Sequence, residues 1–335
     1  MPLKRALVCA AATTLLLTAA CSGDDDSESS SDATASASAS ATASSELPAV
    51  APYVDIVSGT VDVDEVAEST SQTDFTLAFV LADSTGSCTP TWGGKTAIDD
   101  TTVASEIAKI DALGGTSIVS TGGETGTYLE NACTTSDALV TAYETALDAA
   151  GSNHLDVDIE QTITASTVMT ALAALQKARS TTVTLTLPVG GESVGLTDTE
   201  ISILQAAEDA GVEVTVNPMV MNFKATEDDW GSAMTTATES VKTDVASVWT
   251  DKSETEIYAM IGVTPMIGIN GSGGPTTTTA AQTLLTWAEE KGLAFVRFWS
   301  VNRDNGDCTD GKVASNCSGI SQTDYAFTKL FTSFS

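Results

Sequence analysis

Eight short runs rich in β-branched and aromatic residues recur along the chain. They cover residues 52–57, 75–82, 116–123, 154–160, 182–189, 212–223, 257–268 and 293–301. Intervening segments, such as 101–115, 137–151, 168–180 and 201–211, repeat apolar residues at helical spacing, and several end in glycine. This alternation predicts an α/β protein with a single (β/α)8 (TIM) barrel. A doubly wound open sheet is the alternative, but no Gly-x-Gly-x-x-Gly motif follows the first run.

The N-terminal segment has a different character. Lys4 and Arg5 precede a short apolar stretch that ends in small residues before Cys21, which predicts a signal peptide over residues 1–20 rather than a membrane span. The sequence LTAAC (17–21) resembles a bacterial lipobox, in which the cysteine becomes lipidated; simple secretion is the alternative. We expect residues 21–46 to hold this lipidation cysteine and a disordered Ser/Ala/Asp-rich linker, and residues 47–335 to form the barrel. The predicted location is therefore the bacterial cell surface, with membrane attachment only through the lipid.

Charge and cysteine content restrict the partners. The formal net charge of −31 disfavours nucleic acid and anionic lipid headgroups, so a neutral ligand is more plausible than a polyanion. Outside the N-terminal segment an even number of cysteines predicts two disulfides; three connectivities are possible, and short spacing favours the pairs Cys308–Cys317 and Cys88–Cys133. His154 is the only histidine and no Cys-x-x-Cys occurs, so no metal site or cofactor is expected.

Residues 154–160, HLDVDIE, alternate apolar and acidic side chains, so Asp156, Asp158 and Glu160 share one face of a strand. In a barrel that face points inward and the C-terminal strand ends form the active site, which places Glu160 at the catalytic rim. Repulsion among the crowded carboxyls keeps a proton on the group, so that Glu160 can donate it near neutral pH. The alternative is a solvated acidic strand in an acidic protein. His154 is expected at the opposite, structural end of the barrel.

Several segments, in barrel order, resemble glycoside hydrolase family 18, the chitinase family. They are PTWGG (90–94), STGG (120–123), LDVDIE (155–160), VNPMVMNF (216–223), TPMIGIN (264–270) and FWSVNRD (298–304). In this family the N-acetyl oxygen of the substrate attacks the anomeric carbon, so one general acid is sufficient. The resemblance implies that Glu160 is the acid/base, that Asp158 orients the acetamido group, and that Asp156 holds Asp158 from deeper in the barrel.

The resemblance also implies the sugar contacts. Trp299 is expected to floor the cleavage site, because pyranose rings pack on flat aromatic surfaces. Trp92 is expected either to support a neighbouring sugar or to pack within its loop. The remaining expected substrate-binding positions are Met221, Asn222, Phe223 and Asn270.

Three positions at or just after the ends of the sixth and seventh runs depart from the family pattern. Asn222 and Phe223 stand where related chitinases carry Asp-Tyr, and Gly271 follows Asn270 where an aspartate is common. The missing tyrosine hydroxyl would donate to the N-acetyl oxygen, and losing one such donor costs a factor of about 10²–10³ in rate.

The sequence therefore predicts a monomeric, chitinase-like glycosidase that cleaves β-1,4-linked N-acetylglucosamine chains by substrate-assisted, retaining catalysis. The expected partners are chitin or its oligosaccharides. The main alternative is a non-catalytic chito-oligosaccharide-binding surface lipoprotein with a degenerate active site. A protein-binding scaffold is a third interpretation.

Overall fold

The computed structural model describes residues 46–227 and 229–335. The expected signal peptide, Cys21 and all but the last residue of the expected linker lie outside the described residues. Within the described part of the chain, no helix combines the length and apolar character needed to cross a bilayer.

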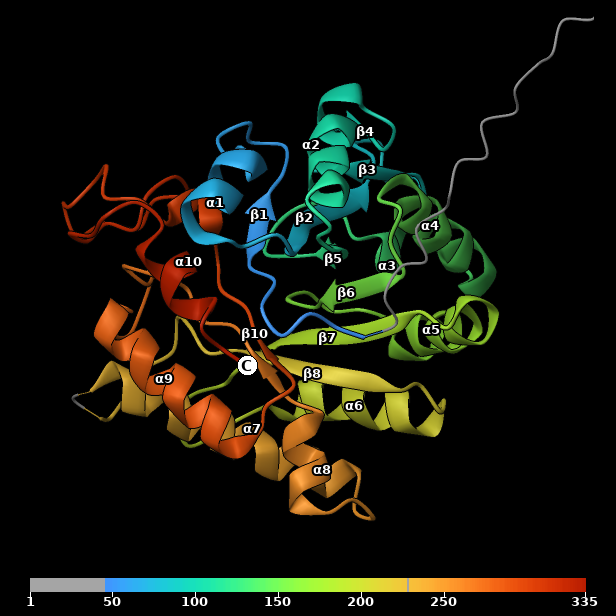
Figure 1. The fold of residues 1–335 in the computed structure, drawn as a ribbon. Helices are drawn as coiled ribbons and strands as arrows, with labels where there is room; N and C mark the ends of the chain where they lie inside the picture. Colours follow the sequence, from blue (N-terminus) through green and yellow to red (C-terminus); the bar gives the residue numbers. More distant parts are fainter. Residues whose placement is uncertain (1–45, 228) are drawn as a thin grey trace, which may run out of the picture. The chain divides into compact units, whose positions relative to one another are not determined.

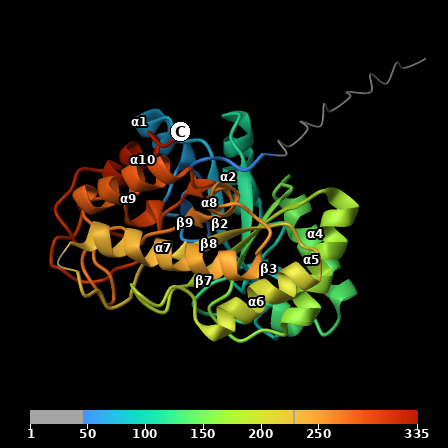
Figure 2. The same cartoon turned by 90° about the horizontal axis from the view of Figure 1, so that it is seen from below.

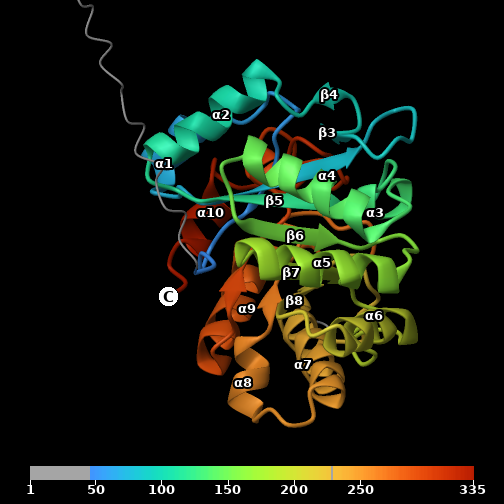
Figure 3. The ribbon, with the colours of Figure 1, turned by 90° about the vertical axis from the view of Figure 1, so that its right-hand side faces the viewer.

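Eight parallel strands form a closed barrel, and several of them lie side by side in Figures 1 and 3. They are β1 (Tyr53–Asp55), β2 (Phe75–Ala82), β5 (Ser117–Gly122), β6 (His154–Asp158), β7 (Thr182–Pro188), β8 (Val214–Met219), β9 (Gly262–Val263) and β10 (Phe295–Val296). Strands β1, β2, β5, β6, β7 and β8 pair in that order, and β9 pairs with β10. Backbone hydrogen bonds complete the ring: Val216 donates to Met260, between β8 and the β9 segment, and Tyr53 donates to Phe298, between β1 and the β10 segment. The predicted (β/α)8 barrel is confirmed.

Helices flank the strands (Figure 2). The longer ones are α1 (Val63–Thr70), α2 (Thr101–Ala112), α4 (Ser136–Ala149), α5 (Ala165–Arg179), α6 (Asp198–Asp209), α7 (Trp230–Val248) and α9 (Thr278–Lys291). Shorter ones are α3 (Leu129–Ala132), α8 (Glu254–Ala259), α10 (Ala326–Phe331) and the 3₁₀ turn η1 (Val301–Arg303). Local signals set their ends: a capping box of Thr197 and Glu200 begins α6, and Gly292 in the left-handed region ends α9.

The strand predictions differ from the structure mainly at the ends of the runs; Val301, for example, ends the run 293–301 but belongs to η1. The run 75–82 is β2 without change, whereas the first residues of the run 257–268 belong to α8. A capping box formed by Ser253 and Glu256 starts that helix, so the apolar residues that follow it are helical rather than extended. Beyond β2, the short strands β3 (Pro90–Trp92) and β4 (Thr96–Ala97) add an antiparallel extension to the sheet.

Two disulfides join the cysteine pairs that spacing favoured. Cys88–Cys133 ties the loop after β2 to the end of α3, and Cys308–Cys317 closes a loop near the C-terminus. His154 begins β6 and is buried, with its ring Nδ1 2.6 Å from Thr182 Oγ1. This places it at the N-terminal, structural end of the barrel, as predicted.

Candidate active site

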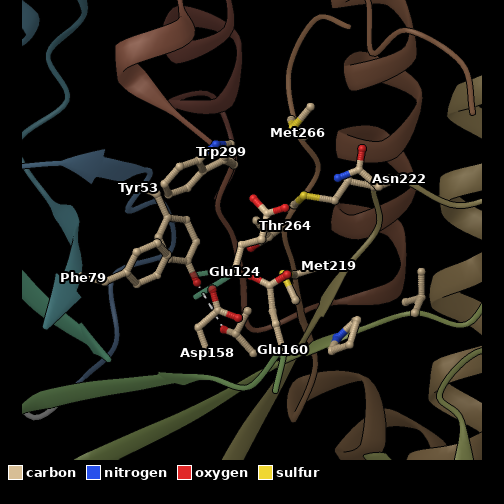
Figure 4. A pocket seen from close by; sticks show the side chains of 14 residues that line it. Tyr53, Phe79, Glu124, Asp158, Glu160, Met219, Asn222, Thr264, Met266 and Trp299 are labelled. Carbon is tan, nitrogen blue, oxygen red and sulfur yellow. Dashed lines mark hydrogen bonds between the residues drawn. The ribbon is translucent and has the colours of Figure 1, made fainter. Parts of the chain in front are cut away.

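A pocket of about 240 Å³ opens at the C-terminal ends of the barrel strands (Figure 4). Each of the eight strands, or the loop that follows it, contributes to its lining. The lining residues are Tyr53, Phe79, Glu124, Asp158, Glu160, Thr186, Pro188, Val189, Met219, Met221, Asn222, Thr264, Met266 and Trp299.

The acidic strand delivers two carboxyls to this pocket. Asp158 is the last residue of β6 and is 3% exposed, whereas Glu160, two residues further, is exposed at the mouth. Tyr128 links the backbone at Glu160 to the loop after β5. Its hydroxyl accepts from the Glu160 amide at 3.0 Å and donates to the Gly123 carbonyl at 2.6 Å. No sequence pattern indicated this role, because Tyr128 lies in a loop and its hydroxyl bonds to backbone groups of distant segments.

The environment of the two carboxyls favours their protonated forms. Desolvation by the surrounding walls, and then the negative charge of Glu124, raise the pKa of Glu160 to about 7. Burial, followed by the charges of Glu160 and Asp156, raises the pKa of Asp158 well above its usual range. Oδ1 of Asp158 is buried and has no hydrogen-bond partner among the described residues. The pair therefore carries a proton near neutral pH and leaves an oxygen available for a ligand.

Asp156 lies below this pair and is fully buried. Its two oxygens accept four hydrogen bonds, from Tyr53 Oη (2.9 Å), Ser120 Oγ (2.6 Å), Thr186 Oγ1 (2.6 Å) and Arg297 Nη1 (3.1 Å). Asp156 makes no hydrogen bond to Asp158, because donors from the surrounding strands occupy both of its oxygens. It acts on Asp158 through its charge, which Arg297 balances in a fully buried ion pair. The only sign of Arg297 in the sequence was a basic residue inside an apolar strand.

Aromatic side chains form one wall of the pocket (Figure 4). Trp299 and Phe79 stack with ring centroids 5.5 Å apart and an interplanar angle of 14°, and Tyr53 lies 6.0 Å from Trp299. Trp299 remains partly exposed and lines the pocket where the sequence placed it. A flat, partly exposed indole beside two carboxyls suits a sugar ring. Phe79 was not predicted, because nothing in its β2 pattern separates it from a core residue.

Two aromatic residues of the predicted site pack within the fold: for Trp92 this is the packing alternative, whereas the sugar contact expected of Phe223 is not formed. Trp92 lies in β3 with no exposed surface, and its Nε1 donates to the Ile98 carbonyl at 3.2 Å, so it packs within the fold. Phe223 is 4% exposed, lies outside the pocket lining and packs on Trp230 with ring centroids 4.6 Å apart. Neither ring has a free face for a ligand.

The remaining predicted contacts divide between lining and support. Met221 and Asn222 line the pocket. Asn270 does not: it is buried, its Oδ1 accepts from the Asn222 amide at 3.2 Å, and its Nδ2 donates to the Met266 carbonyl at 3.2 Å. Asn222 in turn accepts from the Gly271 amide at 2.7 Å. Asn270 therefore supports the segment that carries Asn222 instead of contacting a ligand, which corrects its predicted role.

Comparison with known proteins gives a consistent set of relatives, although no family-level sequence profile matches the chain. The chain is similar to active domain 2 of the thermostable chitinase from Pyrococcus furiosus, solved as catalytic-site mutants complexed with chito-oligosaccharides (31% identity, TM-score 0.79, covering 86% of this chain and 95% of that one). It is 28% identical to a probable bifunctional chitinase/lysozyme of Escherichia coli (strain K12) over 85% of this chain, and 28% identical to endochitinase 11 of Metarhizium anisopliae over 76%. The chain spans 34% and 52% of the lengths of these two curated relatives.

Proposed function

The chain belongs to glycoside hydrolase family 18, the family of the chitinases, and we propose that it hydrolyses β-1,4-linked N-acetylglucosamine chains with Glu160 as general acid. One observation carries the proposal: Glu160 stands at the mouth of an aromatic-walled pocket, next to a buried Asp158 whose Oδ1 has no hydrogen-bond partner within the described chain. The chito-oligosaccharides complexed with catalytic-site mutants of the Pyrococcus furiosus relative support the choice of substrate.

The geometry supports a substrate-assisted reaction. The sugar packs on Trp299, and the free oxygen of Asp158 accepts the acetamido N–H. The carbonyl oxygen of the same acetamido group attacks the anomeric carbon while Glu160 gives its proton to the departing glycosidic oxygen. Glu160, now ionised, then takes a proton from water as that water opens the oxazolinium ring, which restores the acid and retains the anomeric configuration.

One observation favours the binding-protein alternative. Phe223 lacks the hydroxyl of the family's tyrosine and its ring faces Trp230, so it cannot help to position the acetamido carbonyl. A pocket with fewer donors for the developing charge turns over more slowly, and one that binds without turnover is the limiting case.

Release of soluble sugars from chitin separates these functions. The purified wild-type protein is compared with Glu160→Gln, which keeps the shape of the side chain and removes its proton. We expect only the wild type to release sugars. The affinities of the two proteins for chito-oligosaccharides, measured by calorimetry, should agree within a few fold. Binding without release by the wild type would support the binding protein. Neither binding nor release would contradict both sugar-directed functions.

We also propose export as a lipoprotein anchored through Cys21, supported by the lipobox-like sequence and the Ser/Ala/Asp-rich stretch after it. Mass spectrometry of the mature protein should find a lipid on an N-terminal Cys21, and Cys21→Ser should release the protein into the medium. An unmodified N-terminus elsewhere would indicate simple secretion.

A further inference from the structure

Glu124 is a third carboxylate in the pocket, beside Asp158 and Glu160 (Figure 4). Two glycines at the end of β5 allow the backbone to place Glu124 in the pocket. Gly122 and Gly123 have φ values of 90° and 92°, and a Cβ at these positions would lie 1.9 Å from the Asp158 carbonyl oxygen and 2.8 Å from the Phe79 ring, respectively. Only glycine permits this close passage of the backbone along the pocket wall, so the position of Glu124 is built into the loop.

The Glu124 carboxylate has no hydrogen bond or ion pair within the described residues, and it is exposed to the pocket mouth. The pocket lining contains three carboxyl groups and no lysine or arginine. The negative charge of Glu124 helps to raise the pKa of Glu160. An independent feature marks the pocket as a ligand site: the buried Oδ1 of Asp158 has no partner in the described chain. The unbalanced negative charge of this site favours a ligand that carries a cation.

Partly deacetylated chitin is such a ligand, because each glucosamine unit carries a protonatable amine. The reaction fixes where that amine can lie. The sugar that is attacked must keep its acetamido group, since the carbonyl oxygen of that group is the nucleophile. The amine must therefore belong to a neighbouring sugar. Glu160 contacts the bond to the leaving group, and Glu124 lies on the same side of the pocket: Gln161, the residue after Glu160, donates from its Nε2 to the Glu124 carbonyl at 3.5 Å.

We propose that Glu124 is a specificity-determining residue that binds the protonated amine of a glucosamine on the leaving-group side of the cleaved bond. The proposal rests on the proposed chitinase function. The formal charge of −31 on the chain acts in the same direction, because it attracts a polycationic substrate at long range.

Two defined tetrasaccharides test the proposal. One contains four N-acetylglucosamines, and the other has glucosamine as its third sugar from the non-reducing end. Cleavage between the second and third sugars places that amine on the leaving group. For this bond we expect the wild-type kcat/KM to be about fivefold higher with the mixed tetramer, the range of a solvent-accessible ion pair. The preference should fall in high salt and as pH rises above the pKa of the sugar amine.

Glu124→Gln should abolish the preference. The ratio of the two kcat/KM values is the readout, because any change in the general acid affects both substrates alike. Glu290→Gln, which removes one exposed charge from α9 outside the pocket, is the matched control and should keep the preference. Equal wild-type kcat/KM values for the two tetramers, or a preference that survives Glu124→Gln, would overturn the proposal.

Failure of the proposed function has a different signature. A chain that cleaves neither tetramer is not a chitinase, and calorimetry then compares the affinities of the same two sugars for the wild type and Glu124→Gln. A fivefold preference that Glu124→Gln removes would still support the amine site, and equal affinities would reject it.

Discussion

Replacing Arg297 by methionine removes the cation from the centre of the barrel while keeping much of the side-chain volume. Arg297 and Asp156 are both 0% exposed, and Nη1 lies 3.1 Å from Oδ1. Losing one partner of a buried ion pair leaves an uncompensated charge and costs about 3–5 kcal/mol. Three hydroxyl donors to Asp156 remain in the variant, so we expect a loss near the lower end, about 3 kcal/mol. This is a large part of the 5–15 kcal/mol typical of a folded domain.

Denaturant unfolding of the purified protein measures this loss, as a lower midpoint with an unchanged slope. Arg179→Met is the matched control. Its guanidinium lies 2.6 Å from Asp148 with the two side chains 25% and 69% exposed, so the same substitution should cost at most about 1 kcal/mol. A loss below 1 kcal/mol for Arg297→Met, or one no larger than the control shows, would refute the assignment of a structural charge pair.

Three further predictions concern the pocket. Because Glu160 must be protonated to act as an acid and its pKa is raised to about 7, kcat/KM should fall as pH rises through that value. Glu124→Gln removes a repelling charge and lowers the pKa of Glu160, so the fall in kcat/KM should move to lower pH. An unchanged pH profile would reject the electrostatic coupling between Glu124 and Glu160. Phe223→Tyr should leave kcat unchanged, because the ring lies outside the pocket; a clear rise in kcat would show that it reaches the substrate. Trp299→Ala should raise KM by roughly tenfold, whereas Trp92→Ala should lower the free energy of unfolding by about 3–5 kcal/mol with little effect on KM; the reverse pattern would contradict their placement.

The barrel and its acidic strand were predictable because regular periodicity governs both. Strand alternation with a period of two put Asp156, Asp158 and Glu160 on one face, and strand–helix alternation put that face inside a barrel. The residues at the rim of the barrel were harder to predict, because the alternation of side chains between the two faces stops where each strand ends. Asn222 adopts a left-handed conformation with φ 56°, which breaks the alternation after β8. Phe223 consequently packs on Trp230 rather than in the pocket.

Other features depend on contacts between distant parts of the chain. Arg297 and Asp156 are 141 residues apart, and no local pattern pairs them. Trp92 lies in a segment that reads as a glycine-rich loop, but β3 pairs with β2 and buries the ring. Glu124 follows the two glycines of a recognisable segment, yet its place in the pocket depends on how closely the backbone passes Asp158 and Phe79.

Proton NMR of freshly released sugar tests the central claim most directly, because it reports the stereochemistry of the step assigned to Asp158 and Glu160. With a β-linked N-acetylglucosamine oligomer as substrate, the wild-type protein should first release the β-anomer, as attack by the acetamido oxygen followed by water requires. Glu160→Gln should release none on the same timescale. First release of the α-anomer, or equal release by Glu160→Gln, would contradict substrate-assisted catalysis with Glu160 as the acid.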